Sequence, residues 1–251
     1  MRLLLLADIH ANLEALEAVL ADAATRGYSD TLFLGDAVGY GADAGAVVQR
    51  LRLLSPRCIM GNHEQMLLSA ARTGKTSDTP VGLALKLALS QLSPDDLEWL
   101  RGWKQGIKAL HGNVECFFVH GSPRDPNEYM DSLSAARAAF TDWAGRLAFV
   151  GHSHIAGVYA GLERDTSNVR FTAFLEGVNR MTLPPRGRWI VNPGSVGQPR
   201  DGDPRAGYGI FDFNRNALEV YRVEYNVAEA QLKIRAAGLP DVLAARLSVG
   251  K

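Results

Sequence analysis

The first sixty residues alternate short apolar runs with helix-forming segments, and this order constrains the fold more than any other feature of the chain. Leu3 to Ala7 is continuously apolar, which is typical of a strand covered on both faces. Asn12 then stands where a helix cap is preferred, before a segment with apolar residues on one helical face. The predicted elements are helix 13–23, strand 31–34, helix 44–54, strand 57–60 and a helix from about residue 63. This βαβαβ order predicts a parallel sheet with right-handed crossovers.

The rest of the chain has a helical middle and a strand-rich second half. Residues 80–91 have the composition of a helix, and Ser93 and Pro94 supply a cap and a first-turn proline for another. We expect strands at 114–119, 146–150, 155–160, 169–175, 188–191, 207–213 and 217–225, the last two as a hairpin. Residues 161–168 are predicted to be an exposed loop, and residues 227–250 a helix around a break at 238–240. No repeat or linker divides the chain, so we expect one domain over residues 1–251 with two packed sheets.

The composition excludes several classes of protein. Charges balance, with 27 basic and 27 acidic residues, so nothing in the total indicates attraction to nucleic acid or acidic lipid. No apolar run reaches the roughly 18 residues of a membrane span, and the N-terminal run is too short for a signal peptide. Cys58 and Cys116 both lie in apolar runs, where buried free thiols are expected. We therefore expect a cytoplasmic protein.

Polar residues follow the apolar runs at several points. Four of the five short motifs that contain them coincide with a turn after such a run, as expected of strand ends that build one site on one edge of a sheet. The candidate metal ligands are Asp8, His10, Asp36, Asn62, His120, His152 and His154. Carboxylate, amide and imidazole groups without thiolate suit Mn, Fe, Zn or Mg better than a structural zinc site. Seven ligand side chains are too many for one ion and reasonable for two. Asp36 is the natural shared ligand, because a carboxylate can bridge two cations and a neutral imidazole cannot.

Each motif alone is weak, because a single strand-end histidine is more often capped or solvated than a ligand. The complete set indicates a metal site, because five of the six histidines belong to it or adjoin it. In addition, glycines precede Asp36, Asn62 and His152, where they permit tight turns. The sixth histidine, His111, is expected in a surface turn. Trp99 and Trp103 are expected to pack in the core.

The complete set resembles the motifs of the calcineurin-like metallophosphoesterases in order and spacing. The resemblance is carried by Asp8-x-His10, Gly35-Asp36, Gly61-Asn62-His63-Glu64, His120-Gly121, Gly151-His152-x-His154 and the stretch from Asn192 to Arg200. It implies a four-layer α/β/β/α sandwich of two mixed sheets flanked by helices, with the site at the strand ends. It also implies that Asp8, His10 and His154 hold one metal ion, that Asn62, His120 and His152 hold the other, and that Asp36 bridges them.

The resemblance implies a hydrolytic chemistry as well. Two ions, with Mn favoured and Fe, Zn, Ni, Co or Mg as alternatives, would supply a metal-bound hydroxide that attacks a phosphoester. His63 corresponds to the proposed general acid of the family, which also contacts the phosphate together with Asn62. Glu64 is interpreted mainly as part of the helix start, with orientation of His63 as the alternative.

The substrate class follows from two departures from the family pattern. Protein serine/threonine phosphatases and symmetrical dinucleoside tetraphosphatases carry Asp-Arg where this chain has Gly39 and Tyr40, and Arg where it has Met60. Loss of two guanidinium groups that suit a doubly charged monoester favours phosphodiesters. Arg200 is a candidate replacement in substrate binding. Arg205 is the other candidate, and an ordinary loop role is the alternative for both.

Two rival functions remain open from the sequence. One is a phosphomonoesterase or dinucleoside polyphosphate hydrolase that uses the same site. The other is a binding scaffold without catalysis, as in a retromer subunit with this fold, although such proteins usually lose ligands that this chain retains. The Asn192–Gly197 stretch is expected to be a structural turn beside the site, and the expected partner is a small phosphoester or nucleotide-like substrate. The sequence does not predict an oligomeric state.

Overall fold

The structure is a computed structural model that describes residues 1–111, 114–162 and 165–251. The strands are β1 (Arg2–Leu6), β2 (Asp30–Phe33), β3 (Arg57–Cys58), β4 (Gly106–His111), β5 (Val114–Val119), β6 (Leu147–Phe149), β7 (Gly157–Leu162), β8 (Asp165–Ala173), β9 (Val178–Thr182), β10 (Gly187–Asn192), β11 (Ala206–Asp212) and β12 (Ala217–Val223). The helices are α1 (Leu13–Ala24), α2 (Ala44–Leu54), α3 (Asn62–Thr73), α4 (Pro80–Gln91), α5 (Pro94–Arg101), α6 (Leu133–Asp142), α7 (Val227–Ala236), α8 (Asp241–Ala245) and the 3-10 helix η1 (Arg246–Ser248).

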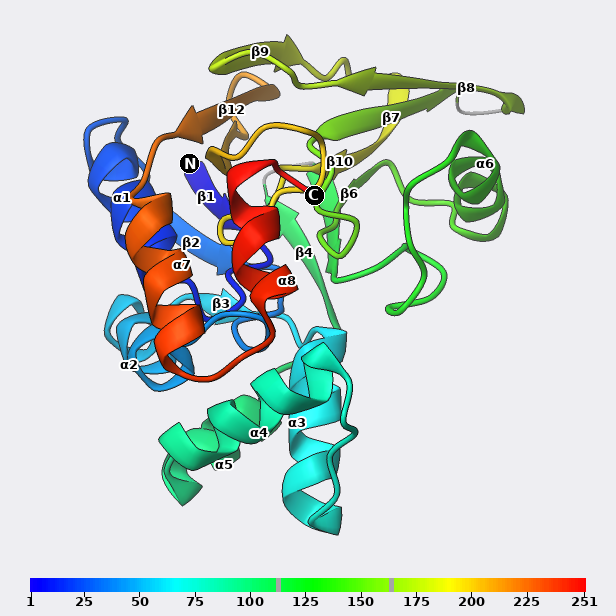
Figure 1. The fold of residues 1–251 in the computed structure, drawn as a ribbon. Coiled ribbons are helices and arrows are strands. Elements are labelled where there is room, and N and C mark those ends of the chain that lie inside the picture. The colour runs from blue at the N-terminus through cyan, green and yellow to red at the C-terminus, as the bar shows by residue number, and fades with distance from the viewer. Residues whose placement is uncertain (112–113, 163–164) are drawn as a thin grey trace.

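Within the described residues the strands form two mixed sheets of six strands each (Figure 1). The first has the order β3-β2-β1-β11-β12-β9 and the second β4-β5-β6-β10-β7-β8. Strands β1, β2 and β3 are parallel neighbours, as are β5, β6 and β10. The other neighbouring pairs are antiparallel, including the predicted hairpin of β11 and β12. The predicted α/β class with two mixed sheets is confirmed.

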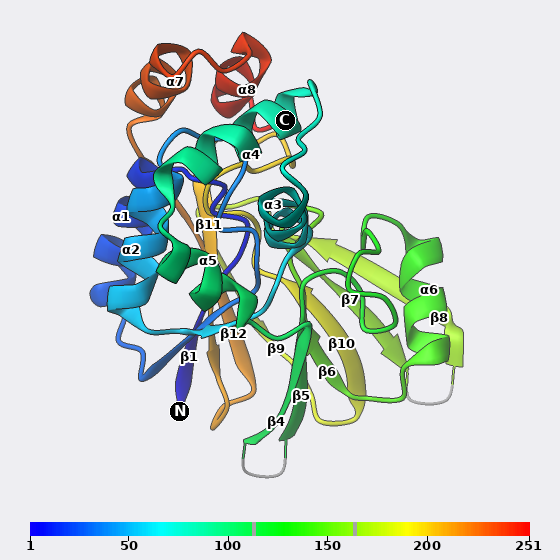
Figure 2. The same ribbon diagram turned by 90° about the horizontal axis from the view of Figure 1, so that it is seen from below.

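Alternation along β1 explains how the layers form. Leu3 and Leu5 belong to a buried cluster that also holds Phe118 and Phe149 of the second sheet. Leu4 and Leu6 belong to a cluster on the opposite face, which contains the buried residues of α1 and α2. Because successive side chains of a strand point to opposite faces, one fully apolar strand serves both layers. Figure 2 shows α1 and α2 against the first sheet and α6 against the second, which gives the expected four-layer order.

The helical middle agrees with the sequence prediction. Helices α2 and α4 have the predicted bounds, and Ser93 caps α5 through its side chain. Trp103 is buried in the same cluster as Leu100, and Trp99 packs against it, so the predicted core role of both tryptophans is confirmed. Cys58 and Cys116 are buried and unpaired, also as predicted. Among the described residues, none of the helices combines the length and apolar character needed to cross a bilayer.

One prediction is wrong. Residues 161–168 were expected to form an exposed loop, but β7 extends to Leu162 and β8 begins at Asp165, while residues 163–164 lie outside the described residues. The charged sequence there is typical of a loop, yet cross-strand pairing of Leu162 with Asp165 continues the hairpin. The structure also contains α6, β4 and β9, which the sequence did not indicate.

The sheet topology brings the motif residues to one edge. Asp8 follows β1, Asp36 follows β2 and Asn62 follows β3. His120 follows β5 and His152 follows β6 in the second sheet. Because the carboxyl ends of parallel strands lie at the same edge of a sheet, both sheets present their polar loops there.

Candidate metal centre

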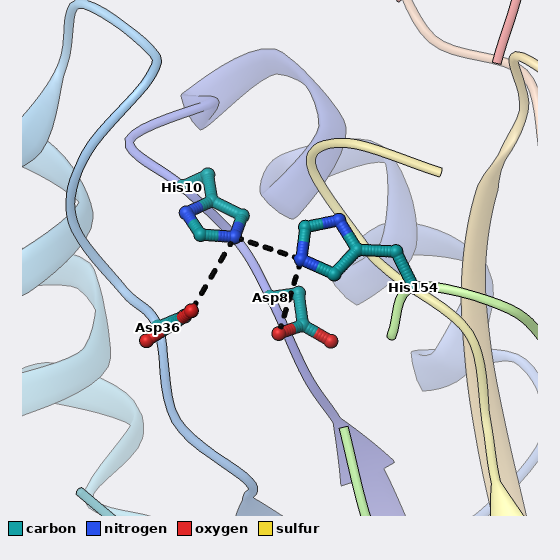
Figure 3. Close-up of side chains that lie close together, drawn as sticks. All are labelled: Asp8, His10, Asp36 and His154. Carbon is teal, nitrogen blue, oxygen red and sulfur yellow. Dashed lines mark hydrogen bonds and ion pairs between the residues drawn. The ribbon is translucent and has the colours of Figure 1, made fainter. Parts of the chain in front are cut away.

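The predicted ligands from both sheets meet in one buried cluster. Nε2 of His10 lies 3.1 Å from Nε2 of His154 and 3.6 Å from Oδ2 of Asp36. Nε2 of His154 also lies 3.5 Å from Oδ1 of Asp8, and Figure 3 shows these four side chains facing one another. Residues more than 140 positions apart in the sequence are therefore neighbours in space.

A second group of ligands adjoins the first through Asp36. Nε2 of His120 lies 3.3 Å from Oδ2 of Asp36 and 3.1 Å from Oδ1 of Asn62. The ring of His120 lies 4.8 Å from that of His152, measured between centroids. Ligand atoms of Asp36, His120 and His152 lie within 4.8 Å of one another, as do those of Asp8, His10, Asp36 and His154. Asp36 thus belongs to two groups of possible metal ligands.

The tautomers of His10 and His154 leave their Nε2 atoms without a hydrogen-bond donor. Nδ1 of His10 lies 3.0 Å from the carbonyl oxygen of Val38, and Nδ1 of His154 lies 2.5 Å from that of Gln198. A carbonyl oxygen only accepts, so both Nδ1 atoms carry the proton and both Nε2 atoms present lone pairs. These two lone pairs face each other at 3.1 Å. Such an arrangement is unfavourable unless a cation lies between the rings, and it fits a metal ion.

The same argument extends to the second group. Nδ1 of His120 donates to the carbonyl oxygen of Leu34 at 2.7 Å, so its Nε2 faces Asp36 and Asn62 as a further acceptor unless it binds a proton. Nε2 of His152 is buried and has no partner among the described residues. Nitrogen and oxygen lone pairs without matching donors are the donor set of a transition-metal site.

Charge and burial give the candidate ligands different ionisation states. Burial opposes ionisation of Asp36, yet the nearby His120 and His63 hold its pKa well below the ordinary value. Burial favours neutral His120 as well, but the charge of Asp36 raises its pKa to about 9. Burial lowers the pKa of His10 and His154, which keeps both rings neutral. A neutral imidazole is the form that binds a metal ion.

The backbone at the ligands is strained. The φ angles of five of them lie between 49° and 65°, a region that residues other than glycine rarely adopt, and these five are Asp8, His10, Asp36, His152 and His154. Strain of this kind costs about 1–3 kcal/mol per residue and persists where surrounding structure fixes it, often at functional sites. The strained turns aim consecutive strand-end side chains at a common point.

The side chain of Glu64 and the Asn192–Gly197 turn hold these ligand loops in place. The carboxylate of Glu64 accepts hydrogen bonds from the backbone N–H groups of Asp36, Ala37 and Gly61, each at 2.8–2.9 Å. Glu64 therefore starts α3, as predicted, and also fixes the loop that carries Asp36. A Cβ at Gly61 would lie 2.1 Å from Oδ1 of Asp36, which explains the glycine before Asn62.

The Asn192–Gly197 stretch is a structural turn, as expected from the sequence. Oγ of Ser195 donates to the carbonyl oxygen of Asp8 at 2.8 Å, and the amide of Asn192 donates to that of Gly151 at 2.7 Å. A Cβ at Gly197 would lie 1.7 Å from the carbonyl oxygen of Ile9. The turn therefore packs directly against the backbone of two ligand loops.

Comparison with known proteins identifies the family. Residues 1–216 match the model of the calcineurin-like phosphoesterase superfamily domain. The chain belongs to this family. A metallophosphoesterase from Sphaerobacter thermophilus has a similar crystal structure, with 37% identity, full coverage of both chains and a TM-score of 0.84. An uncharacterized protein of Methanocaldococcus jannaschii is 34% identical to this chain in a comparison that covers 98% of this chain and 97% of that protein.

A further relative has a named activity. The symmetrical bis(5'-nucleosyl)-tetraphosphatase of Chromohalobacter salexigens is 31% identical over 184 residues, which cover 69% of this chain and 60% of that protein. Membership of the calcineurin-like phosphoesterases supports a phosphoric ester hydrolase and agrees with the His and Asp cluster.

His63 lies beside the cluster in this phosphoesterase. Its backbone N–H donates to Oδ1 of Asp36 at 2.9 Å, and its ring lies 4.6 Å from the rings of His10 and Tyr40. Nδ1 of His63 is buried and has no partner among the described residues. A Cβ at Gly39 would lie 2.1 Å from this Nδ1, so the ring in this position requires glycine at residue 39.

The two candidate arginines have different surroundings. Nη2 of Arg200 donates to the hydroxyl oxygen of Tyr40 at 3.2 Å, which places it beside the centre. Arg205 instead makes a two-pronged contact with Asp203, through Nε at 3.0 Å and Nη2 at 2.7 Å. The structure thus favours the ordinary loop role for Arg205. His111 ends β4 and contacts the ring of Phe213 at 4.3 Å, apart from the cluster.

One aromatic neighbour of the centre, Tyr129, was not predicted from the sequence. The ring of Tyr129 stacks on His152 with centroids 3.8 Å apart, although 44% of the tyrosine is exposed. Tyr129 lies in an irregular segment between β5 and α6, where no periodic pattern or motif marks it. Tyr40 was noted only as a departure from the family, whereas its ring contacts both His10 and His63.

Proposed function

We propose that residues 1–251 form one domain that holds two divalent or transition-metal ions and hydrolyses phosphodiester bonds in small or nucleotide-like substrates. The observation that carries this proposal is that the buried nitrogen and oxygen atoms form two groups of possible metal ligands, and that Asp36 belongs to both. Family membership supports the phosphoester chemistry.

The ligands divide between the ions as follows. Asp8, His10 and His154 would hold one ion, Asn62, His120 and His152 the other, and Asp36 both. Such a pair, when bound, lowers the pKa of water and neutralises phosphate oxygens during an in-line displacement. The donor set accepts Mn, which we favour, and also Fe, Zn, Ni, Co or Mg.

His63 would act as the general acid that protonates the leaving oxygen. Its backbone bond to Asp36 fixes it beside the centre, while Nδ1 has no partner among the described residues. Burial lowers the pKa of His63 below its ordinary value. A phosphate anion beside the ring would favour the protonated form, so substrate binding itself would charge the acid.

A groove on the far side of His63 would receive the leaving group. Between α3 and α4 lies a groove of about 390 Å³ that is bordered by Tyr40, Asn62 and His63. Its walls combine the apolar Met66, Val81 and Leu85 with the hydroxyl groups of Ser69, Ser77 and Thr79. An apolar wall with a few polar groups suits an organic substituent such as a nucleoside.

The preference for diesters rests on the missing arginines. Tyr40 and Met60 supply no positive charge at the positions where protein serine/threonine phosphatases and symmetrical dinucleoside tetraphosphatases carry arginine, and Arg200 approaches the centre from the side of Tyr40. A site with fewer positive charges suits a singly charged phosphoryl group better than a doubly charged one.

A dinucleoside polyphosphate is a second candidate substrate, because the Chromohalobacter salexigens relative is a symmetrical tetraphosphatase. The two candidates share a feature, since each inner phosphate of a polyphosphate chain is substituted on both sides and carries one charge.

The test compares two chromogenic substrates. We expect the Mn-loaded protein to hydrolyse bis(p-nitrophenyl) phosphate with a higher kcat/KM than p-nitrophenyl phosphate, and chelation to abolish both rates. A monoester preference above about tenfold, equivalent to about 1.4 kcal/mol, would contradict the diester assignment. The rate with diadenosine tetraphosphate is measured in the same series, and a kcat/KM above that for the nitrophenyl diester would favour the dinucleoside polyphosphate substrate.

A further inference from the structure

The C-terminal segment closes over one side of the metal centre. Ala230, Ile234, Leu243 and Leu247 pack in a buried cluster against which Tyr40 lies. The cluster thus joins α7, α8 and η1 to the loop after Asp36. This segment follows the last residue matched by the family model, residue 216.

Two polar contacts fix the segment further. Nζ of Lys233 lies 2.8 Å from Oδ2 of Asp43, which follows the Tyr40 loop. The backbone N–H of Gly202 donates to the carbonyl oxygen of Gly250 at 3.0 Å, beside the loop that carries Arg200. The C-terminal segment is therefore attached to both loops that border the centre at this point.

Two arginines lie beside the ring of Tyr40 as a result. The guanidinium carbons of Arg200, from the loop after β10, and Arg246, from η1, each lie 5.6 Å from the centroid of this ring. Both arginine side chains are half-buried. We call Arg200, Tyr40 and Arg246 the arginine pair site.

Neither arginine is neutralised by an acidic side chain. Within the described residues, no aspartate or glutamate oxygen lies within 4.0 Å of either guanidinium, although Arg246 donates through Nε to the backbone oxygen of Lys251. The neighbouring Arg205 and Arg222, by contrast, pair with Asp203 and Asp201.

Nε of Arg200 is buried without a partner. Burial and the charge of Arg200 lower the pKa of Arg246. Arg200 therefore has no anionic partner among the described residues, and its charge beside an aromatic ring and a second cation is one that an anion would relieve.

The arginine pair site adjoins the metal centre. The backbone N–H of Arg200 donates to the carbonyl oxygen of His154 at 3.2 Å, and the ring of Tyr40 lies 4.6 Å from those of His10 and His63. A ligand bound at the metal ions would therefore have Tyr40 at its edge and the two guanidinium groups beyond it.

We propose that Arg200 and Arg246, both beside the ring of Tyr40, bind a second phosphate of the substrate next to the phosphate at the metal centre. The position of the first phosphate rests on the proposed function. The planar forks of two arginines match phosphate oxygens in paired hydrogen bonds, which lysine does not. The substrate class is then a nucleotide with at least two consecutive phosphates, joined through an inner phosphate that resembles a diester.

The test measures binding rather than turnover. Isothermal titration of the Mn-loaded protein compares AMP, with one phosphate, and adenosine 5'-(α,β-methylene)diphosphate, with two that cannot be cleaved apart. We expect the native protein to bind the diphosphate analogue at least about tenfold more tightly than AMP. We expect Arg246→Gln to weaken binding of the analogue about tenfold and that of AMP less than about threefold.

Two further variants control the experiment. Arg235→Gln removes an equal charge from an exposed arginine of α7 that pairs with Asp241, and it should change neither affinity. Arg246→Lys retains the charge without the planar fork and should give an intermediate loss for the analogue, which also covers the case that Arg246→Gln fails to fold. Equal losses for both ligands in the Arg246 variants, or no preference for the analogue in the native protein, would overturn the proposal.

The two proposals fail in different ways. Hydrolysis of bis(p-nitrophenyl) phosphate by the same preparation, without a diphosphate preference, overturns the arginine pair site alone. Binding of the analogue with the predicted dependence on Arg246, but without hydrolysis of any ester, overturns the proposed function alone.

Discussion

The direction of each histidine ring determines what the centre can bind. His10, His120 and His154 donate through Nδ1 to backbone carbonyl oxygens, so their Nε2 atoms all point into the centre. The motif sequences predict which residues lie at the site, because four of the five motifs follow an apolar run. They do not predict ring orientation, since the accepting carbonyl groups of Val38, Leu34 and Gln198 belong to other loops. Tyr129 and Arg246 were missed for the same reason: only the folded chain brings them near the centre.

Replacement of His63, the proposed general acid, separates catalysis from metal binding. We expect His63→Asn to lower kcat about 10²–10⁴-fold, because it removes the proton donor, and to leave the metal content unchanged. Steady-state kinetics with bis(p-nitrophenyl) phosphate and elemental analysis of the same sample provide the measurement. His111→Asn, which changes a histidine outside the cluster, should retain native kinetics. Native turnover in His63→Asn would refute the acid role.

Replacement of Glu64 by glutamine tests whether its carboxylate holds the Asp36 loop in position for metal binding. Glu64 accepts three short backbone hydrogen bonds through two oxygens, and a glutamine has only one oxygen to offer. Because its amide N–H would face another N–H, we expect Glu64→Gln to weaken metal binding about 10–100-fold. Competition with a chromogenic chelator measures this affinity. The exposed Glu98→Gln serves as control, and equal affinities in both variants would show that Glu64 is dispensable.

Helices and strands were predicted well where their signals are local. Helix caps such as Asn12 and Ser93, and continuous apolar runs such as Leu3 to Leu6, need no knowledge of distant residues. The missed strands β4 and β9 are edge strands with only partial burial, so their sequences carry little apolar alternation. Helix α6 is short and rich in alanine, and it buries only Ala136, Ala139 and Phe140. Such elements depend on their neighbours more than on their own pattern.

The start of α5 provides a test at the level of one helix. Asp96 forms a capping box with Ser93 and accepts hydrogen bonds from Gln49 and Arg52 of α2 at 2.8 and 2.7 Å. We expect Asp96→Asn to lower the free energy of unfolding by about 1–2 kcal/mol at pH 7, measured by urea denaturation. The matched control is Asp95→Asn, an exposed acid in the same helical turn.

The pH dependence of this effect follows from the pKa of Asp96. Burial alone would raise this pKa, but hydrogen bonds from Ser93 and Arg52 lower it in the folded protein. The stabilisation is therefore complete above the unfolded value near 3.8 and is lost as pH falls through the folded value. The difference between native and Asp96→Asn protein should shrink on acidification below pH 4. A constant difference from pH 7 to pH 3 would contradict this account.

The complete fold creates a site that neither sheet has alone. Asp8, Asp36 and Asn62 come from the first sheet, and His120 and His152 from the second, so the two halves meet only when the sheets pack through their shared buried cluster. The sequence predicted that these residues converge, because strand ends share an edge. It could not predict the relative placement of the two sheets, which depends on packing between Leu3, Phe118, Phe149 and their neighbours.

Binding of metal should stabilise the whole molecule. Lone pairs that face one another in the metal-free protein are relieved by cations, and a ligand that binds only the folded state adds about 2.7 kcal/mol at 100 times its Kd. For a chain of this length we expect Mn to raise Tm by about 5–10 °C over the chelated protein, as measured by calorimetry. An unchanged Tm at saturating Mn would contradict metal binding to the folded state.

The number of ions per chain is the most direct test of a centre divided by Asp36. Elemental analysis of protein reconstituted with Mn and freed of excess metal should find about two ions in the native chain and in His63→Asn. Asp36→Asn should retain one ion or none, because Asp36 belongs to both groups of ligands and each group would lose its carboxylate. Fewer than one ion in the native protein, or two in Asp36→Asn, would contradict the shared carboxylate on which the proposed function depends.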